Sequence, residues 1–150
     1  MSSGMSGTKE SVVTVHGSVV AFAGRGLLIL GDSGAGKSGL ALALIGRGAA
    51  LVADDQVRVS RVGDALLARA PAALGGMIEV RGLGLLRIPS VPEATLTLAV
   101  DLDRTPAARM PQPQTITYLG IEVELISGRD LPNLDLLLTI YVHNGRAFPD

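Results

Sequence analysis

The sequence has 150 residues, the length of one compact domain. Hydrophobic residues make up 47% and charged residues 18%, which excludes a disordered or collagen-like chain, and the absence of cysteine excludes disulfide scaffolds and thiolate chemistry. Lys and Arg total 13 against 14 Asp and Glu, and this balance argues against binding to nucleic acid or to a membrane surface.

The chain is expected to begin with a flexible N-terminus over residues 1–10, because this stretch is polar and lacks the apolar core of a signal peptide. One cytoplasmic domain should follow over residues 11–150. Valine-rich Ser11–Val15 and Ser18–Phe22 are predicted as strands. A Gly-Arg-Gly turn should join them in a hairpin to Leu27–Leu30, a continuous aliphatic run typical of a strand covered on both faces.

The middle of the chain is predicted to contain a helix, a strand and a hairpin. Ser38–Arg47 has leucine and isoleucine at helical spacing and ends at glycines. Ala49–Ala53 is predicted as a buried strand that ends in the acidic pair Asp54-Asp55. Val57–Leu67 has two apolar segments around a Gly-Asp turn, which is typical of a hairpin.

The second half predicts more strands and one more helix. Met77–Ile88 contains short strand-like pieces, and Leu96–Leu102 and Thr115–Ile126 alternate in the manner of strands. Asp103–Pro113, with three prolines and two arginines, is predicted as a mobile loop. Asn133–Val142 is predicted as a helix, although its Leu and Ile content also permits a strand. The pattern indicates one mixed α/β domain.

One motif matches a phosphate-binding loop, or P-loop, at every position. Residues 31–38 read GDSGAGKS, which satisfies G-x-x-x-x-G-K-[ST] between a predicted buried strand and a predicted helix. Backbone N–H groups of such a loop hold phosphate oxygens, Lys37 bridges the β- and γ-phosphates, and the Ser38 hydroxyl joins a magnesium shell. We therefore predict a nucleoside triphosphate site formed by Gly31, Asp32, Ser33, Gly34, Ala35, Gly36, Lys37 and Ser38.

Two groups of acids are candidates for the same site. The predicted helix after the loop runs about 15 Å away at ~1.5 Å per residue, and the next strand returns about as far. If this connection is a right-handed βαβ crossover, Asp54 and Asp55 emerge at the sheet edge that carries the loop, where ligands bind. Asp101 and Asp103 also follow a predicted strand, and we interpret them as a solvated strand end.

Four motifs occur in order: His16-Gly17, GDSGAGKS, LVADD and MIEVRGLGLL. Together they resemble the catalytic (C-terminal) domain of HPr kinase/phosphorylase, the bacterial family that acts on a serine of the phosphocarrier protein HPr. The resemblance runs from about Val15 to Arg146 and identifies residues 11–150 as a single HPr kinase-like catalytic domain. It implies a P-loop-containing mixed sheet with few helices, a PEP-carboxykinase-like fold, in a short form that lacks the family's N-terminal domain. It also implies a homohexamer.

The resemblance further implies catalytic roles. Asp55 would take the proton from the attacking serine hydroxyl, His16 would help to position the reacting groups, and Arg109 is the nearest match to the catalytic arginine of a mobile loop. From the residue types alone, two of these keep another interpretation. A histidine at a strand end is often a structural hydrogen-bonding group, and an arginine in a proline-rich loop is often a surface charge.

The resemblance implies ATP and Mg²⁺ as cofactors, with Ser38 and Glu79 as metal ligands. Glu79 and Arg81 stand two apart and would share one side of a strand, where they are equally well interpreted as a solvated pair. Asp54, Arg81 and Arg129 are further candidate site residues.

The expected activity is an ATP- and Mg²⁺-dependent serine kinase that acts on HPr or an HPr-like phosphocarrier and so regulates sugar and phosphotransferase metabolism. The late family element needed for dephosphorylation appears only as residues 127–130, SGRD, so phosphate-driven dephosphorylation should be weak or absent. Two alternatives remain: a non-catalytic, ATP-sensing regulatory module, and a kinase for a small metabolite, because phosphate-binding residues do not identify the acceptor.

Overall fold

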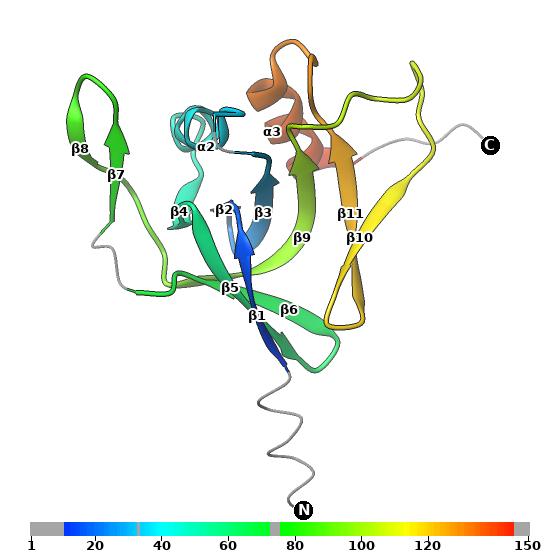
Figure 1. The fold of residues 1–150 in the computed structure, drawn as a ribbon, viewed down its shortest axis with the longest axis horizontal. Helices are drawn as coiled ribbons and strands as arrows, with labels where there is room; N and C mark the ends of the chain where they lie inside the picture. The colour runs from blue at the N-terminus through cyan, green and yellow to red at the C-terminus, as the bar shows by residue number, and fades with distance from the viewer. Residues whose placement is uncertain (1–10, 33, 73–75, 146–150) are drawn as a thin grey trace, which may run out of the picture.

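The computed structural model describes residues 11–32, 34–72 and 76–145. The N-terminus predicted to be flexible, residues 1–10, lies outside the described residues. Within these ranges the chain forms a nine-stranded mixed sheet, a separate two-stranded hairpin and two helices (Figure 1). The predicted mixed α/β fold with few helices is confirmed. Neither described helix is long and apolar enough to cross a membrane.

The first part of the chain contains β1 (Val12–His16), β2 (Ser18–Phe22), β3 (Arg25–Leu30), α2 (Lys37–Ile45) and β4 (Ala50–Ala53). β2 and β3 pair as the predicted hairpin. We expected β1 to join this hairpin, but it pairs instead with the strand that follows β4.

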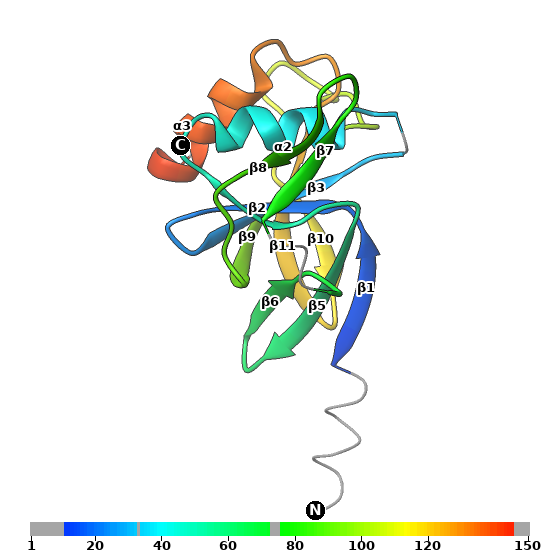
Figure 2. The same cartoon turned by 90° about the vertical axis from the view of Figure 1, so that its left-hand side faces the viewer.

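The middle part contains β5 (Gln56–Val62), β6 (Ala65–Arg69), β7 (Met77–Val80), β8 (Gly84–Arg87) and β9 (Glu93–Asp101). β5 and β6 form the predicted hairpin. β7 and β8 form a further hairpin, which stands apart from the main sheet on the side of α2 (Figures 1 and 2).

The last part contains β10 (Gln114–Tyr118), β11 (Ile121–Ser127) and α3 (Leu134–Asn144). β10 and β11 pair antiparallel. The predicted final helix is confirmed as α3. Between β9 and β10, residues 102–113 form neither helix nor strand.

The order of strands brings several carboxyl ends to one sheet edge. The main path is β1-β5-β6-β9-β3-β2-β4, and β11 pairs with β9. β3 and β4 both run antiparallel to β2, so they are parallel to each other, and α2 connects them across β2. β9 and β11 are also parallel to β3 and to each other. The residues that follow β3, β4, β9 and β11 therefore gather at the same edge.

The core has two parts, one on each face of the curved sheet. One part lies under α2 and α3, with Ala41, Leu44 and Leu138 from the helices. The other lies within the curve of the sheet, where residues of β5, β6 and β11 face those of β2 and β9. In β3, residues 27–29 are at most 1% exposed and contribute to both parts. This confirms a strand covered on both faces, and each such aliphatic side chain contributes roughly 1.5–3 kcal/mol by burial.

Candidate active site

The glycine-rich loop, residues 31–38, joins β3 to α2. Gly34 (φ +88°) and Gly36 (φ +98°) have left-handed backbone conformations, which glycine adopts without steric cost. The loop closes on itself through a 2.9 Å hydrogen bond from the Ala35 N–H to the Asp32 carbonyl. Predicted site residue Ser33 lies outside the described residues. The loop therefore has the strand–turn–helix context that the motif requires.

Lys37 begins α2 and folds back over the loop. Its side chain is buried although it carries a charge, with the residue 8% exposed. Nζ donates hydrogen bonds to the carbonyl oxygens of Gly31, at 2.8 Å, and Asp32, at 3.2 Å. These two acceptors compensate part of the cost of burying an ammonium group, and they hold it at the loop where an anion would need it.

A cavity of about 290 Å³ opens beside the loop. Its lining combines loop residues with one residue of the acidic pair: Gly34, Gly36, Lys37, Ser38, Gly39 and Asp55. The structure thus brings Asp55 and Lys37 to one cavity, although they lie 18 positions apart in the sequence (55 − 37).

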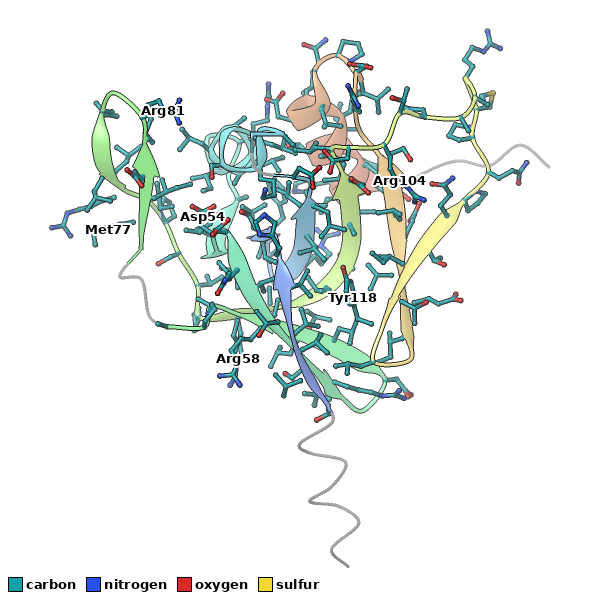
Figure 3. All side chains as sticks on the ribbon, viewed as in Figure 1. Asp54, Arg58, Met77, Arg81, Arg104 and Tyr118 are labelled. Atoms are coloured by element: carbon teal, nitrogen blue, oxygen red, sulfur yellow. The ribbon has the colours of Figure 1, made fainter. Side chains whose placement is uncertain are left out.

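Asp54 connects the loop to the sheet. Its Oδ1 accepts a hydrogen bond from the Ser38 hydroxyl at 3.2 Å and another from the Ser18 hydroxyl at 2.8 Å. Figure 3 shows Asp54 at the end of β4, close to α2. Ser18, which is fully buried, was not among the predicted site residues. The one signal for it in the sequence is a hydroxyl at the start of an otherwise apolar strand.

Asp55 lies beside His16, at the end of β1. Asp55 Oδ1 is 3.9 Å from His16 Nε2, and the side chains are 72% and 51% exposed. This distance is too long for a hydrogen bond, but it allows electrostatic attraction when the imidazole is protonated. Asp55 has a left-handed backbone (φ +71°), and its carbonyl accepts a 3.0 Å hydrogen bond from the Gly17 N–H. The structure therefore brings Asp55 to the edge that carries the loop, as predicted, and it places His16 beside Asp55.

Asp101 and Asp103 do more than end a strand. Asp103 Oδ2 accepts a 2.8 Å hydrogen bond from the backbone N–H of Asp32 in the glycine-rich loop. Asp101 Oδ1 accepts from the Asp103 N–H at 2.9 Å, and its Oδ2 lies 3.9 Å from Arg104 Nε. Both acids lie at the end of β9 and Asp103 is exposed, which agrees with our interpretation as a solvated strand end, but β9 lies next to β3 and therefore also brings Asp103 against the loop.

The β7–β8 hairpin carries two predicted residues away from this cavity. Glu79 is exposed on β7, and Arg81 lies in the turn after that strand ends, so the two do not share one strand as predicted. Neither lines the cavity beside the glycine-rich loop. In the described part of the chain, no cluster of three or more His, Asp or Glu side chains is arranged to hold a metal.

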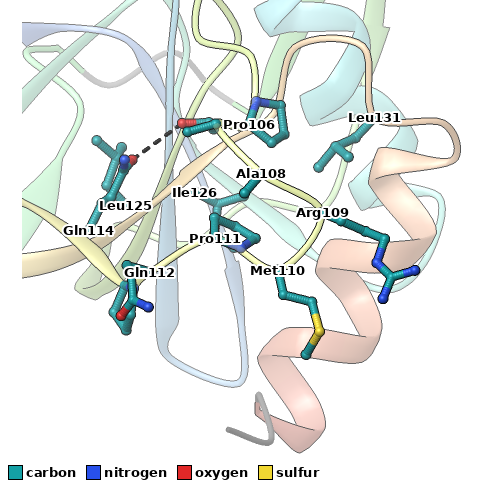
Figure 4. A pocket seen from close by; sticks show the side chains of 13 residues that line it. Pro106, Ala108, Arg109, Met110, Pro111, Gln112, Gln114, Leu125, Ile126 and Leu131 are labelled. Carbon is teal, nitrogen blue, oxygen red and sulfur yellow. Dashed lines mark hydrogen bonds between the residues drawn. The ribbon is translucent and has the colours of Figure 1, made fainter. Parts of the chain in front are cut away.

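The remaining predicted arginines lie in two other places. Arg109 lines a second cavity, of about 800 Å³, between the segment that joins β9 to β10 and the residues beneath it. The other lining residues include Pro106, Met110, Pro111, Leu125, Ile126 and Leu131 (Figure 4). Arg129 follows β11, and its backbone N–H donates to the Arg104 carbonyl at 2.9 Å. Arg129 therefore lies near the edge that carries the loop, whereas Arg109 does not line the loop cavity.

The fold and the site together define a mixed α/β domain with a glycine-rich strand–loop–helix unit and several carboxylates at one sheet edge. The family model of the HPr serine kinase C-terminal domain matches residues 9–102. The chain belongs to this family, and the resemblance predicted from its motifs is confirmed.

Individual relatives agree with this assignment. The HPr kinase/phosphorylases of Burkholderia lata and Burkholderia cenocepacia are each 40% identical over 148 aligned residues, covering 87% of this chain. The alignment covers 45% of each of these relatives, so the chain spans less than half of their length. The solved HPr(Ser) kinase/phosphatase from Coxiella burnetii superposes with a TM-score of 0.74 and 30% identity, covering 88% of this chain and 95% of that one.

Proposed function

We propose that this domain is a serine kinase that binds ATP with Mg²⁺ at the glycine-rich loop and phosphorylates HPr or an HPr-like phosphocarrier protein. The observation that carries the proposal is the 290 Å³ cavity, which presents the Lys37 ammonium and the Asp55 carboxylate together. Membership of the HPr serine kinase C-terminal domain family supports the choice of acceptor.

The hydrogen bonds of Lys37 support nucleotide binding at the loop. Its ammonium group donates to two neutral carbonyls, those of Gly31 and Asp32. Phosphate oxygens would replace them with charge-assisted hydrogen bonds, which are roughly twice as strong. The N-terminus of α2 lies at the same place and favours negative charge. Binding of the triphosphate therefore requires a change of hydrogen-bond partners at Lys37 rather than a change of fold.

The donors beside the loop fit magnesium. The Ser38 hydroxyl and the Asp54 carboxylate meet at 3.2 Å, and oxygen donors of this kind suit the small, hard Mg²⁺ ion. Ser38 and Asp54 would hold the ion, which would neutralise charge on the phosphate oxygens. Glu79, on the β7–β8 hairpin, enters as a ligand through the family resemblance alone.

Asp55 is the proposed general base. As the oxygen of the HPr serine bonds to the γ-phosphorus, the bond from that phosphorus to ADP breaks and the hydroxyl proton passes to the Asp55 carboxylate. A positioned base of this kind is worth typically ~10²–10⁴ in rate. His16, 3.9 Å from Asp55, would orient it. Arg109 remains a proposed catalytic arginine on the strength of the resemblance.

The test incubates the protein with γ-labelled ATP, Mg²⁺ and purified HPr, beside the variant Asp55→Asn. We expect phosphoserine on HPr from the unaltered protein. The variant should keep ATP affinity and lose at least about 100-fold in transfer. Equal transfer by both proteins would remove Asp55 from the mechanism. ATP binding without any transfer would instead support the ATP-sensing regulatory module. Transfer of label to an added small metabolite, and not to HPr, would support the small-metabolite kinase.

Three further properties belong to the proposal: assembly into a hexamer, a cytoplasmic location and weak reverse activity. Sedimentation of the purified protein tests the first, and a mass of one chain would contradict it. For the last, phospho-serine HPr incubated with inorganic phosphate should release little phosphoryl group. Rapid release with formation of pyrophosphate would show that the SGRD segment at residues 127–130 suffices for dephosphorylation.

A further inference from the structure

The acidic pair lies at a bend that two strand pairs share. β1 pairs with β5 and β2 pairs with β4, both antiparallel, and the register of His16 with Gln56 continues to Val19 with Ala53, after which it shifts by one residue. Gly17 therefore lies opposite Asp55, and Ser18 lies opposite Asp54. At this bend a side chain replaces a regular ladder partner, because the Asp55 N–H donates to the Ser18 hydroxyl at 3.2 Å.

The Ser18 hydroxyl serves both acids at once. It donates its one proton to Asp54 Oδ1 at 2.8 Å and accepts from the Asp55 backbone N–H. A serine hydroxyl has one donor and two acceptor positions, so a single group can make both bonds. Ser18 is fully buried and does not line the cavity, which means that it cannot touch the substrate directly.

Each of these bonds acts on a residue that lines the cavity, one on Ser38 through Asp54 and the other on Asp55 directly. Asp54 Oδ1, held by Ser18, also receives the Ser38 hydroxyl, so Ser18 fixes the carboxylate that meets the loop. The bond to the Asp55 N–H holds a non-glycine residue in a left-handed conformation, which is sterically unfavourable. The Asp55 side chain is 72% exposed, so its position depends on this backbone.

We propose that Ser18 is a positioning residue for phosphoryl transfer. Its hydroxyl aligns Asp54 toward Ser38 and fixes the backbone from which Asp55 reaches the cavity. This inference rests on the proposed kinase function, because it assigns Ser18 a role in the same site.

The kinetic test compares Ser18→Ala, Ser18→Thr and the control Ser60→Ala, a half-buried strand serine outside the site. Ser18→Ala should lower kcat for HPr phosphorylation at least about tenfold, with KM for HPr and the affinity for ATP changed less than about threefold. Ser18→Thr, which keeps the hydroxyl, should recover most of kcat, and Ser60→Ala should match the unaltered protein. Unchanged kcat in Ser18→Ala, or a loss confined to ATP affinity, would overturn the proposal.

A second readout needs no nucleotide. Hydrogen exchange of the Asp55 amide should be at least about tenfold faster in Ser18→Ala than in the unaltered protein and unchanged in Ser60→Ala. Ser18→Ala should also cost less in an Asp54→Ala background than alone, because part of its effect passes through Asp54. Equal cost in both backgrounds, together with an unaltered Asp55 amide, would contradict a positioning role.

Failure to fold is covered by a third variant. If Ser18→Ala is unfolded, Ser18→Cys keeps a similar volume with a weaker hydrogen-bonding group and should show the same loss of kcat. If neither variant folds, the hydroxyl serves stability and the proposal is wrong. The unaltered protein separates the two claims: absent transfer to HPr sinks the proposed function, whereas normal transfer with normal Ser18 variants sinks this inference alone.

Discussion

Lys37 is the residue that, in the proposed function, changes hydrogen-bond partners when a nucleotide binds. Its ammonium group already lies at the glycine-rich loop, held by the Gly31 and Asp32 carbonyls, and it is nearly buried. A group placed in this way loses little conformational entropy on binding, because its long side chain is ordered beforehand. If the loop binds phosphate as we propose, Lys37 is therefore largely ordered before the phosphate arrives.

Asp103 offers a prediction at the same scale. Its carboxylate anchors the loop through the Asp32 N–H, a charge-assisted bond on an exposed surface. Asp103→Ala should loosen the loop and weaken ATP binding about threefold to tenfold, measured by isothermal titration. Asp64→Ala, at a fully exposed turn, serves as the control and should change nothing. Undiminished affinity in Asp103→Ala would mean that the loop holds its shape without this anchor.

At the scale of secondary-structure elements, Gly17 forms the bend between β1 and β2. A Cβ at this position would lie 2.8 Å from the backbone oxygen of Ile29, which cannot move without shifting β3. We expect Gly17→Ala to lower the free energy of unfolding by about 1–3 kcal/mol and to displace His16 and Asp55. Urea unfolding checks this. Gly39→Ala, a helical position with open space around it, should stabilise the protein by up to about 1 kcal/mol.

If Gly17→Ala unfolds at the same urea concentration as the unaltered protein, β2 tolerates a shift and the bend is not rigid. Loss of stability in Gly39→Ala would show that α2 is constrained by contacts other than helix propensity.

The contact between the end of α2 and α3 depends on pH. The Arg47 guanidinium donates to Asp135 Oδ2 at 2.7 Å and lowers the pKa of that carboxyl from its ordinary value of 3.8. Because the folded-state pKa is the lower one, the pair stabilises the fold above pH 3.8, and this contribution is lost as pH falls through the folded-state pKa.

Asp135→Asn should therefore reduce stability at pH 7 by no more than about 1 kcal/mol, as is usual for a surface ion pair. Thermal unfolding of both proteins from pH 7 down to pH 2 measures the difference. The gap should close as the carboxyl becomes protonated in the unaltered protein. A gap that persists at pH 2 would assign the effect to packing rather than to charge.

At the scale of the whole molecule, the sequence predicted the parts that depend on local signals. The glycine-rich loop followed from its motif, and the return of Asp54 and Asp55 to that loop followed from the lengths of one helix and one strand. Local patterns do not specify which distant strands pair. The pairing of β2 with β4 places Ser18 beside Asp54, and the pairing of β3 with β9 places Asp103 beside the loop.

The same limit applies to residues carried by hairpins and irregular segments. The motif around Glu79 was recognised, but nothing local to it indicates that β7 and β8 pair only with each other and stand apart from the main sheet. Arg109 lies in a segment without regular structure, and it lines the same cavity as Leu125, Ile126 and Leu131, which come from other parts of the chain. Tertiary contacts, rather than sequence period, place these side chains.

The most direct measurement is a crystal structure of the protein with a non-hydrolysable ATP analogue, Mg²⁺ and HPr. We expect Lys37 Nζ to leave the Gly31 and Asp32 carbonyls for the phosphates, and the HPr serine hydroxyl to lie between Asp55 and the γ-phosphorus. A nucleotide bound away from residues 31–38, or an acceptor serine in contact with some other carboxylate, would contradict the account.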